Sequence, residues 1–180
     1  MDHTTERFVV ITGCSGGGKS TLLTALHERG YRTVDEPGRR LMRHSLADPY
    51  KDLKGFAEQA VAMSTRDIEK ERNSSGWVFF DRGLIDAAAA LTFATGASIN
   101  DTLKNAPRFY RRVFFAPPWR AIYRQDEERQ HDFGAAKQEA IRLASAYNDL
   151  GYQLTDLPLW SVEDRAQWVI DQLGSAPAIG

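Results

Sequence analysis

Short apolar runs alternate with longer, half-polar segments along the whole chain. Five of these runs are typical of buried strands, and they span residues 8–12, 31–34, 77–80, 113–116 and 152–154. Strands that alternate with helices form a parallel sheet whose crossover helices cover its faces. The pattern therefore predicts a three-layer α/β fold.

Helices are predicted between these runs, where apolar residues recur at helical spacing. They cover about residues 19–29, 53–73, 84–95, 136–150 and 161–173, and a shorter helix begins near Ser98. The sequence Glu36-Pro37-Gly38 is typical of a turn. Because the chain has no internal repeat and no long linker, we expect one domain over residues 1–174, followed by a frayed tail at 175–180.

A glycine-rich loop joins the first predicted strand to the first predicted helix. Its spacing, Gly-x-x-x-x-Gly-Lys-Ser, indicates a phosphate-binding P-loop in this strand-to-helix context. Glycines let consecutive backbone N–H groups point at phosphate oxygens, and the helix N-terminus adds partial positive charge. Lys19 can reach the β- and γ-phosphates, and Ser20 can ligate Mg²⁺. The predicted nucleotide-binding residues are Gly13, Ser15, Gly16, Gly17, Gly18, Lys19, Ser20 and Thr21.

Asp81 ends the third apolar run, where P-loop proteins place the acid that holds Mg²⁺ directly or through water. The alternative is an ordinary aspartate that caps the next helix. Hydrolytic P-loop motors usually follow this acid with a glutamate that activates water, whereas Arg82 stands there in this chain. An arginine cannot act as a base, but it can hold an anionic substrate. The sequence therefore favours phosphoryl transfer to a bound acceptor over hydrolysis.

Two carboxylates, Asp35 and Glu36, follow the second apolar run. In a parallel sheet they lie at the same edge as the P-loop. A kinase needs a base near the acceptor hydroxyl, and Glu36 is the predicted base. The alternative is that Glu36 only forms part of the turn.

A polar, charged segment follows the fourth apolar run, with Arg120, Arg124 and Arg129 in it. Arg120 and Arg124 are four residues apart, and therefore on one face of a helix. Such a segment can form a mobile lid whose arginines stabilise charge on the transferring phosphoryl group. The alternative is a solvated helix with local ion pairs to its own acidic residues.

Composition narrows the class of protein further. The 180 residues carry a net charge of -1, so no global field attracts nucleic acid or an acidic membrane, and neither partner is expected. The single cysteine excludes an intrachain disulfide, and no apolar run approaches the length of a membrane helix. The polar start leads straight into a strand, so we expect no signal peptide and a cytoplasmic protein. A monomer or homodimer is expected.

Four motifs together resemble a family of small AAA-type ATPase or kinase-like P-loop domains: residues 13–20, 34–37, 79–83 and 116–120. Relatives of that family include the ribosylnicotinamide kinase domain of a bifunctional NAD-biosynthesis regulator. The resemblance covers nearly the whole chain. It implies the fold of the nucleoside and nucleotide kinases, with a sheet of five parallel strands in the order 2-3-1-4-5 and an arginine-bearing lid.

A looser resemblance runs to deoxynucleoside and thymidylate kinases. It implies that Glu36 is the catalytic base, that Asp81 and Arg82 form the acid–arginine pair, and that Gln59 reads the nucleoside base. The sequence departs from that pattern at Gly83, where those kinases usually have serine or tyrosine.

The leading functional hypothesis is a Mg²⁺- and NTP-dependent kinase that phosphorylates a small hydroxylated acceptor, such as a nucleoside. Its predicted catalytic residues are Lys19, Glu36, Asp81, Arg82, Arg120 and Arg124, and its Mg²⁺ ligands are Ser20 and Asp81. ATP is the expected nucleotide, with GTP left open, although no Asn-Lys-x-Asp guanine motif occurs. The alternatives are a nucleotide-dependent switch that acts on a protein partner and a plain ATPase.

Overall fold

A computed structural model describes residues 5–44, 46–120 and 133–176 of the chain. In this part, five strands form one parallel sheet in the order β2-β3-β1-β4-β5, as predicted. The strands are β1 (Phe8–Gly13), β2 (Arg32–Val34), β3 (Val78–Asp81), β4 (Arg112–Ala116) and β5 (Gln153–Asp156). The described residues contain no helix that is both long and apolar enough to cross a membrane.

The burial of each strand follows from its position in the sheet. Every residue of β1 and β3 is buried, which explains their continuous apolar sequences, because helices cover both faces of a parallel sheet. The edge strands β2 and β5 are short and partly exposed. Ile11 pairs with Asp81 on one side and with Phe114 on the other. This register brings the ends of β1 and β3 together at one edge of the sheet.

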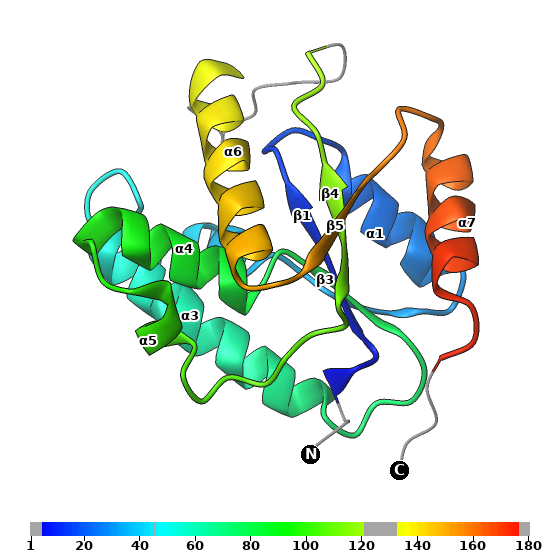
Figure 1. The fold of residues 1–180 in the computed structure, drawn as a ribbon, viewed down its shortest axis with the longest axis horizontal. Helices are drawn as coiled ribbons and strands as arrows, with labels where there is room; N and C mark the ends of the chain where they lie inside the picture. Colours follow the sequence, from blue (N-terminus) through cyan, green and yellow to red (C-terminus); the bar gives the residue numbers. More distant parts are fainter. Residues whose placement is uncertain (1–4, 45, 121–132, 177–180) are drawn as a thin grey trace.

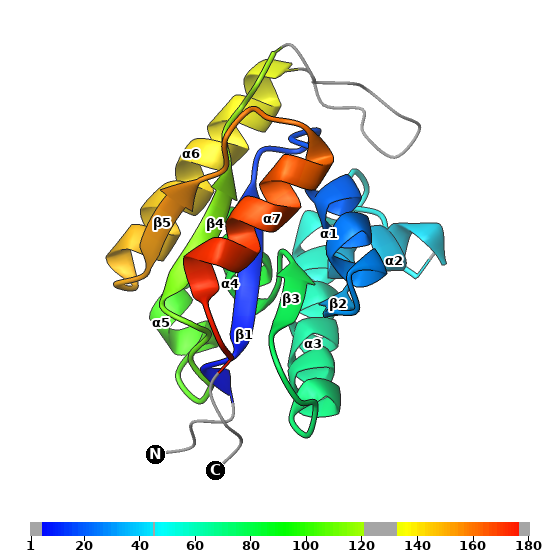
Figure 2. The ribbon, with the colours of Figure 1, turned by 90° about the vertical axis from the view of Figure 1, so that its right-hand side faces the viewer.

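Helices pack on both faces of the sheet (Figures 1 and 2). On one face lie α1 (Lys19–Glu28) and α7 (Val162–Leu173), and on the other lie α3 (Leu53–Glu71), α4 (Leu84–Thr95), α5 (Ile99–Thr102) and α6 (Phe133–Asp149). The buried apolar side chains form one cluster under α1 and α7 and a second one on the opposite face. The three-layer prediction is therefore confirmed.

A short helix that the sequence analysis read as a turn, α2 (Pro37–Arg43), follows β2. Pro37 occupies its first turn, where the fixed φ of proline suits a helix start and its missing N–H costs nothing. Glu36 becomes the N-cap residue, and this places its carboxylate beside the end of β2. The last four residues of the predicted frayed tail, 177–180, lie outside the described residues.

Candidate functional site

The glycine-rich loop is fixed to the sheet at its first residue. Gly13 has a φ of 112°, and a Cβ at this position would overlap the carbonyl oxygen of Ala116 in β4. The next residue, Cys14, donates its backbone N–H to the same carbonyl at 2.8 Å. Only glycine allows this approach of two backbones together with a left-handed φ. The loop therefore starts from a fixed point between β1 and β4.

The loop ends at the N-terminus of α1. Gly18 is the N-cap residue, with a φ of 71°, and it has no side chain to bond the first N–H groups of the helix. These groups remain available to an anion, and the helix dipole favours negative charge there. The structure thus has the geometry that the P-loop motif predicts.

Lys19 folds back over the loop. Its Nζ donates to the carbonyl oxygen of Cys14 at 2.8 Å, and only 5 % of the residue is exposed. Burial lowers the pKa of Lys19, and the neighbouring positive charge of Arg82 lowers it further. A bound phosphate would act against both of these effects on the pKa, because its negative charge favours the protonated, positively charged form of Lys19.

Ser20 and Asp81 lie together, as a Mg²⁺ site requires. The Ser20 hydroxyl donates to Oδ2 of Asp81 at 2.8 Å, whereas Oδ1 of Asp81 is buried and has no hydrogen-bond partner among the described residues. Burial raises the pKa of Asp81 to about 6, and the nearby Glu36 carboxylate contributes to the rise. An unsatisfied carboxylate oxygen beside a hydroxyl suits a hard divalent cation. These two residues therefore fit Mg²⁺, whose remaining ligands would be phosphate oxygens and water.

Arg82 is turned into the protein. It has a left-handed φ of 59°, and its guanidinium donates to the Gly13 carbonyl at 3.0 Å and to the two Glu139 oxygens at 2.8 and 3.3 Å. The carboxylates of Asp86 and Glu36 lie 3.8 and 3.7 Å from its nitrogens. The sequence predicts that Arg82 holds an anionic substrate. In this structure its positive charge is matched by three carboxylates of the chain itself.

Two of these carboxylates, Asp86 and Glu139, were not identified from the sequence. Asp86 is buried on α4 and accepts hydrogen bonds from the Thr12 hydroxyl and, at 2.6 Å, from the Tyr147 hydroxyl. Burial raises its pKa, which the charge of Arg82 opposes. The sequence does contain a signal for Asp86, because an acidic residue is unusual in an alanine-rich apolar helix such as α4. Glu139 lies on the amphipathic helix α6, where a charged residue carries no such signal.

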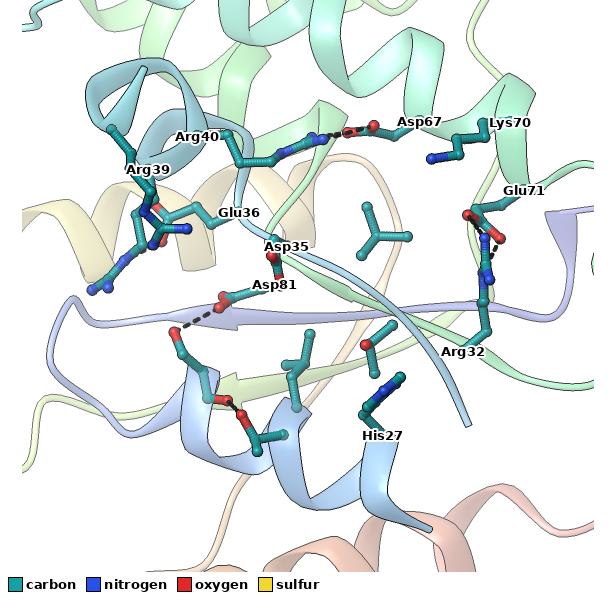
Figure 3. A pocket seen from close by; sticks show the side chains of 16 residues that line it. His27, Arg32, Asp35, Glu36, Arg39, Arg40, Asp67, Lys70, Glu71 and Asp81 are labelled. Carbon is teal, nitrogen blue, oxygen red and sulfur yellow. Dashed lines mark hydrogen bonds and ion pairs between the residues drawn. The ribbon is translucent and has the colours of Figure 1, made fainter. Parts of the chain in front are cut away.

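Glu36 is held at the junction of β2 and α2. Its Oε2 accepts a hydrogen bond from Nε of Arg39 at 3.2 Å, and its Oε1 faces Arg82. It lines a cavity of about 510 Å³ together with Asp35, Ser20 and Asp81. Figure 3 shows Asp35, Glu36 and Asp81 close together at one part of this cavity. The structure thus brings the predicted base next to the predicted metal ligands.

The rest of this cavity is polar and lies between α1, α2, α3 and the edge strand β2. Several of its cations are paired with acids on its walls, as for Arg40 with Asp67 and Arg32 with Glu71 (Figure 3). The other lining residues are Leu23, Thr24, His27, Thr33, Val34, Arg39, Arg43 and Lys70. Gln59, which the resemblance to deoxynucleoside kinases suggested, is exposed on α3 and is not in this lining.

A smaller cavity of about 220 Å³ is bordered by two of the carboxylates that contact Arg82. Its wall is mostly apolar, and Asp86 and Glu139 contribute carboxylates to it. The remaining lining residues are Pro49, Tyr50, Leu53, Ala89, Ala90, Phe93, Ala135, Arg142 and Leu143. Apolar walls with a few converging polar groups are typical of small-molecule sites.

The predicted lid is only partly described. Arg120 is exposed, and its guanidinium carbon lies 5.8 Å from the centre of the Phe133 ring. Arg124 and Arg129 lie outside the described residues. The lid role of Arg120 and Arg124 therefore stays a prediction.

Comparison with solved structures identifies the same fold in small-molecule kinases. A deoxyadenosine kinase from M. mycoides with bound dATP superposes with a TM-score of 0.70 and 13% identity, over 92% of this chain and 98% of that one. The NadR protein in complex with NR superposes with a TM-score of 0.70 and 16% identity, over 92% of this chain and 51% of that one. A shikimate kinase from Acinetobacter baumannii in complex with shikimate superposes with a TM-score of 0.56 and 16% identity, over 92% of each chain. At these identities the likeness concerns the fold alone.

Sequence comparison identifies the family. A nucleotide-binding protein of Granulibacter bethesdensis is 56% identical over 117 residues, which cover 55% of this chain and 36% of that protein. This chain thus matches about a third of the length of that curated relative. The family model AAA_28, described as an AAA domain, matches residues 8–165. With its P-loop kinase-like fold, the chain belongs to this AAA domain family.

Proposed function

We propose that this chain transfers the γ-phosphoryl group of Mg²⁺-bound ATP to a hydroxyl group of a small acceptor, such as a nucleoside. The observation that carries the proposal is the position of Glu36. Its carboxylate lies on the same cavity as Ser20 and Asp81, at the carboxyl end of the sheet. Transfer to a hydroxyl requires a base next to the residues that bind the metal and the phosphates. Hydrolysis would need a residue that activates water, and the glutamate that usually follows Asp81 in hydrolytic P-loop proteins is Arg82 in this chain.

Each residue has a defined part in this reaction. The loop N–H groups and Lys19 bind the β- and γ-phosphates. Mg²⁺ held by Ser20 and Asp81 would supply positive charge to the phosphate oxygens. Glu36 takes the proton of the acceptor hydroxyl while the oxygen of that hydroxyl bonds to the γ-phosphorus. The bond from the γ-phosphorus to the bridging oxygen breaks, and ADP leaves with the electron pair.

We place the body of the acceptor in the smaller cavity. Its apolar wall can hold a ring, and the carboxylates of Asp86 and Glu139 can accept hydrogen bonds from hydroxyl or amino groups. Arg82 joins these two carboxylates to Glu36 through contacts of 3.8 Å or less. A sugar-like or nucleoside-like molecule would thus have both an apolar surface and polar groups to recognise it.

The test of the base is Glu36→Gln, with Asp35→Asn as the matched control at the neighbouring exposed carboxylate. The amide keeps the shape of the side chain but cannot take a proton. We expect a loss of roughly 10²–10⁴-fold in acceptor-dependent turnover, with ATP affinity and melting temperature little changed. An active Glu36→Gln enzyme would contradict the assignment, and an inactive Asp35→Asn enzyme would transfer the role to Asp35.

The test of the acceptor site starts with a transfer screen of labelled ATP against nucleosides, sugars and small alcohols. Ala90→Leu should then raise the KM of the active acceptor, because the added atoms fill the smaller cavity. Thr24→Leu is the control, since it narrows the larger cavity at the α1 wall instead. A raised acceptor KM in Thr24→Leu alone would place the acceptor in the larger cavity.

A second candidate function is a nucleotide-dependent switch. It is favoured by one observation: Arg82 bonds both the Gly13 carbonyl of the P-loop and Glu139 of α6. A change in the loop on nucleotide binding would thereby reach α6. In a switch, Glu36→Gln would leave nucleotide binding and slow hydrolysis intact, and no acceptor in the screen would be phosphorylated.

A further inference from the structure

Arg165 is a buried cation that forms no ion pair in the described residues, although the charge of Glu163 in the same helix acts on it from a greater distance. It lies in the first turns of α7, and only 4 % of it is exposed. Its Nε and Nη1 are buried and have no hydrogen-bond partner, and no carboxylate in the described ranges forms an ion pair with it. Its guanidinium carbon lies 5.8 Å from the centre of the Trp119 ring.

The guanidinium lies against the phosphate-binding loop. A Cβ on Gly18 would approach Nη1 and Nη2 of Arg165 to 3.1 and 3.2 Å, so the two groups are in contact. Gly18 is the N-cap residue of α1 and directly precedes Lys19. Arg165 therefore reaches the loop from the α7 side, and Lys19 from within the loop.

The energetics of this position require a partner. A buried charge is costly unless it is paired, and burial lowers the pKa of Arg165. Arginine nevertheless keeps its charge in proteins. Arg82 is buried to a similar degree but is surrounded by the carboxylates of Glu36, Asp86 and Glu139. Arg165 forms no ion pair among the described residues, and only the more distant Glu163 carboxylate opposes the effect of burial on its pKa. An anion that binds beside Arg165 would therefore gain more than an anion beside Arg82.

We propose that Arg165 contacts the phosphate chain of the nucleotide held by the P-loop, as a second cation beside Lys19. A guanidinium binds phosphate oxygens with a planar pair of N–H donors, which suits two nitrogens lying along Gly18. The assignment rests on nucleotide binding at the P-loop, which is one half of the proposed function. It does not depend on transfer to an acceptor.

The variants that test the assignment are Arg165→Gln and Arg165→Lys, with Arg29→Gln as the matched control. Arg29 also joins α1 to α7, since its Nη2 donates to the Glu163 carbonyl at 3.1 Å, but this bond is exposed and lies at the far end of α1. Titration calorimetry without any acceptor gives the affinities for Mg-ATP and for tripolyphosphate. Thermal melting gives the stability of each ligand-free variant.

We expect Arg165→Gln to weaken the binding of both ATP and tripolyphosphate by about 10- to 100-fold. The ligand-free protein should melt at the same or a higher temperature, because an unpaired buried charge has been removed. Arg165→Lys should recover part of the affinity, and Arg29→Gln should bind both ligands as the wild type does.

Three results would overturn the assignment. A lower melting temperature with unchanged ligand affinity would make Arg165 structural. Weaker binding of ATP but not of tripolyphosphate would indicate a contact to the base or ribose. If the wild-type protein bound neither ATP nor tripolyphosphate, the assignment of the P-loop as a nucleotide site would itself be refuted. Failure to phosphorylate any acceptor would instead refute only the kinase proposal, because this assay contains none.

Discussion

Replacement of Arg82 by methionine tests whether its guanidinium holds the site together or acts on the substrate. Methionine keeps much of the side-chain volume and, like arginine, has to adopt the left-handed backbone at this position. The variant therefore changes mainly the charge. It leaves Glu36, Asp86 and Glu139 without the cation that faces all three of them.

The expected loss follows from the burial of the cluster. The Arg82 and Asp86 side chains are only 9% and 6% exposed, and removal of one partner from a buried ion pair costs about 3–5 kcal/mol. For a domain of this size the melting temperature should fall by about 6 to 20 °C. Arg40→Met is the control, because Arg40 pairs with Asp67 at a more exposed position, and its loss should be near 1 kcal/mol.

The loss should also depend on pH. Burial acts to raise the pKa of Glu139, but the charge and hydrogen bonds of Arg82 bring it below its ordinary value. A lowered folded-state pKa stabilises the protein above the unfolded value of about 4.3, and this stabilisation disappears as the pH falls through the folded value. Without Arg82, only the charges of Lys19 and Arg142 would oppose burial, so the pKa of Glu139 would rise. The destabilisation of Arg82→Met should therefore be largest near pH 7 and shrink toward pH 4.

Urea unfolding at several pH values, together with acceptor-dependent turnover, separates the two roles. A structural Arg82 gives a stability loss that shrinks on acidification. An unchanged free energy of unfolding combined with a large loss of turnover would refute this reasoning, and would assign Arg82 to the substrate as the sequence alone suggested.

Three further variants test the rest of the site. Lys19→Ala should weaken ATP binding by about 2–3 kcal/mol in calorimetry, because it removes the ammonium that reaches the β- and γ-phosphates, and unchanged affinity would contradict the P-loop assignment. Asp81→Asn should weaken binding with Mg²⁺ more than binding in EDTA, and an equal loss in both would make Asp81 structural. Tyr147→Phe should lower the free energy of unfolding by about 2 kcal/mol, because the Tyr147 hydroxyl donates to the buried Asp86 carboxylate. Tyr152→Phe is the control and should lower it less, because the Tyr152 hydroxyl accepts a backbone N–H at 3.2 Å. Equal losses in urea unfolding would contradict a charge-assisted bond between Tyr147 and Asp86.

The local features of the site could be predicted because consecutive residues encode them. The P-loop needs glycine, lysine and serine at fixed spacing in one strand–loop–helix unit, so residues 13–20 identify it without any tertiary contact. The alternation of apolar runs and amphipathic segments gave the strands and most helices for the same reason. It failed at α2, where a proline that suits a turn suits the first turn of a helix equally well.

Only the tertiary structure decided what surrounds Arg82 and Arg165. Strand β3 brings Arg82 to carboxylates from the start of α2, from α4 and from α6, which are distant in sequence, and α7 brings Arg165 to Gly18 at the other end of the chain. A charged residue looks the same in sequence whether it is solvated, paired or buried alone. Its electrostatic role depends on the neighbours that packing supplies. The sequence therefore determined where the P-loop lies, while the fold determined which charges near it are paired with carboxylates.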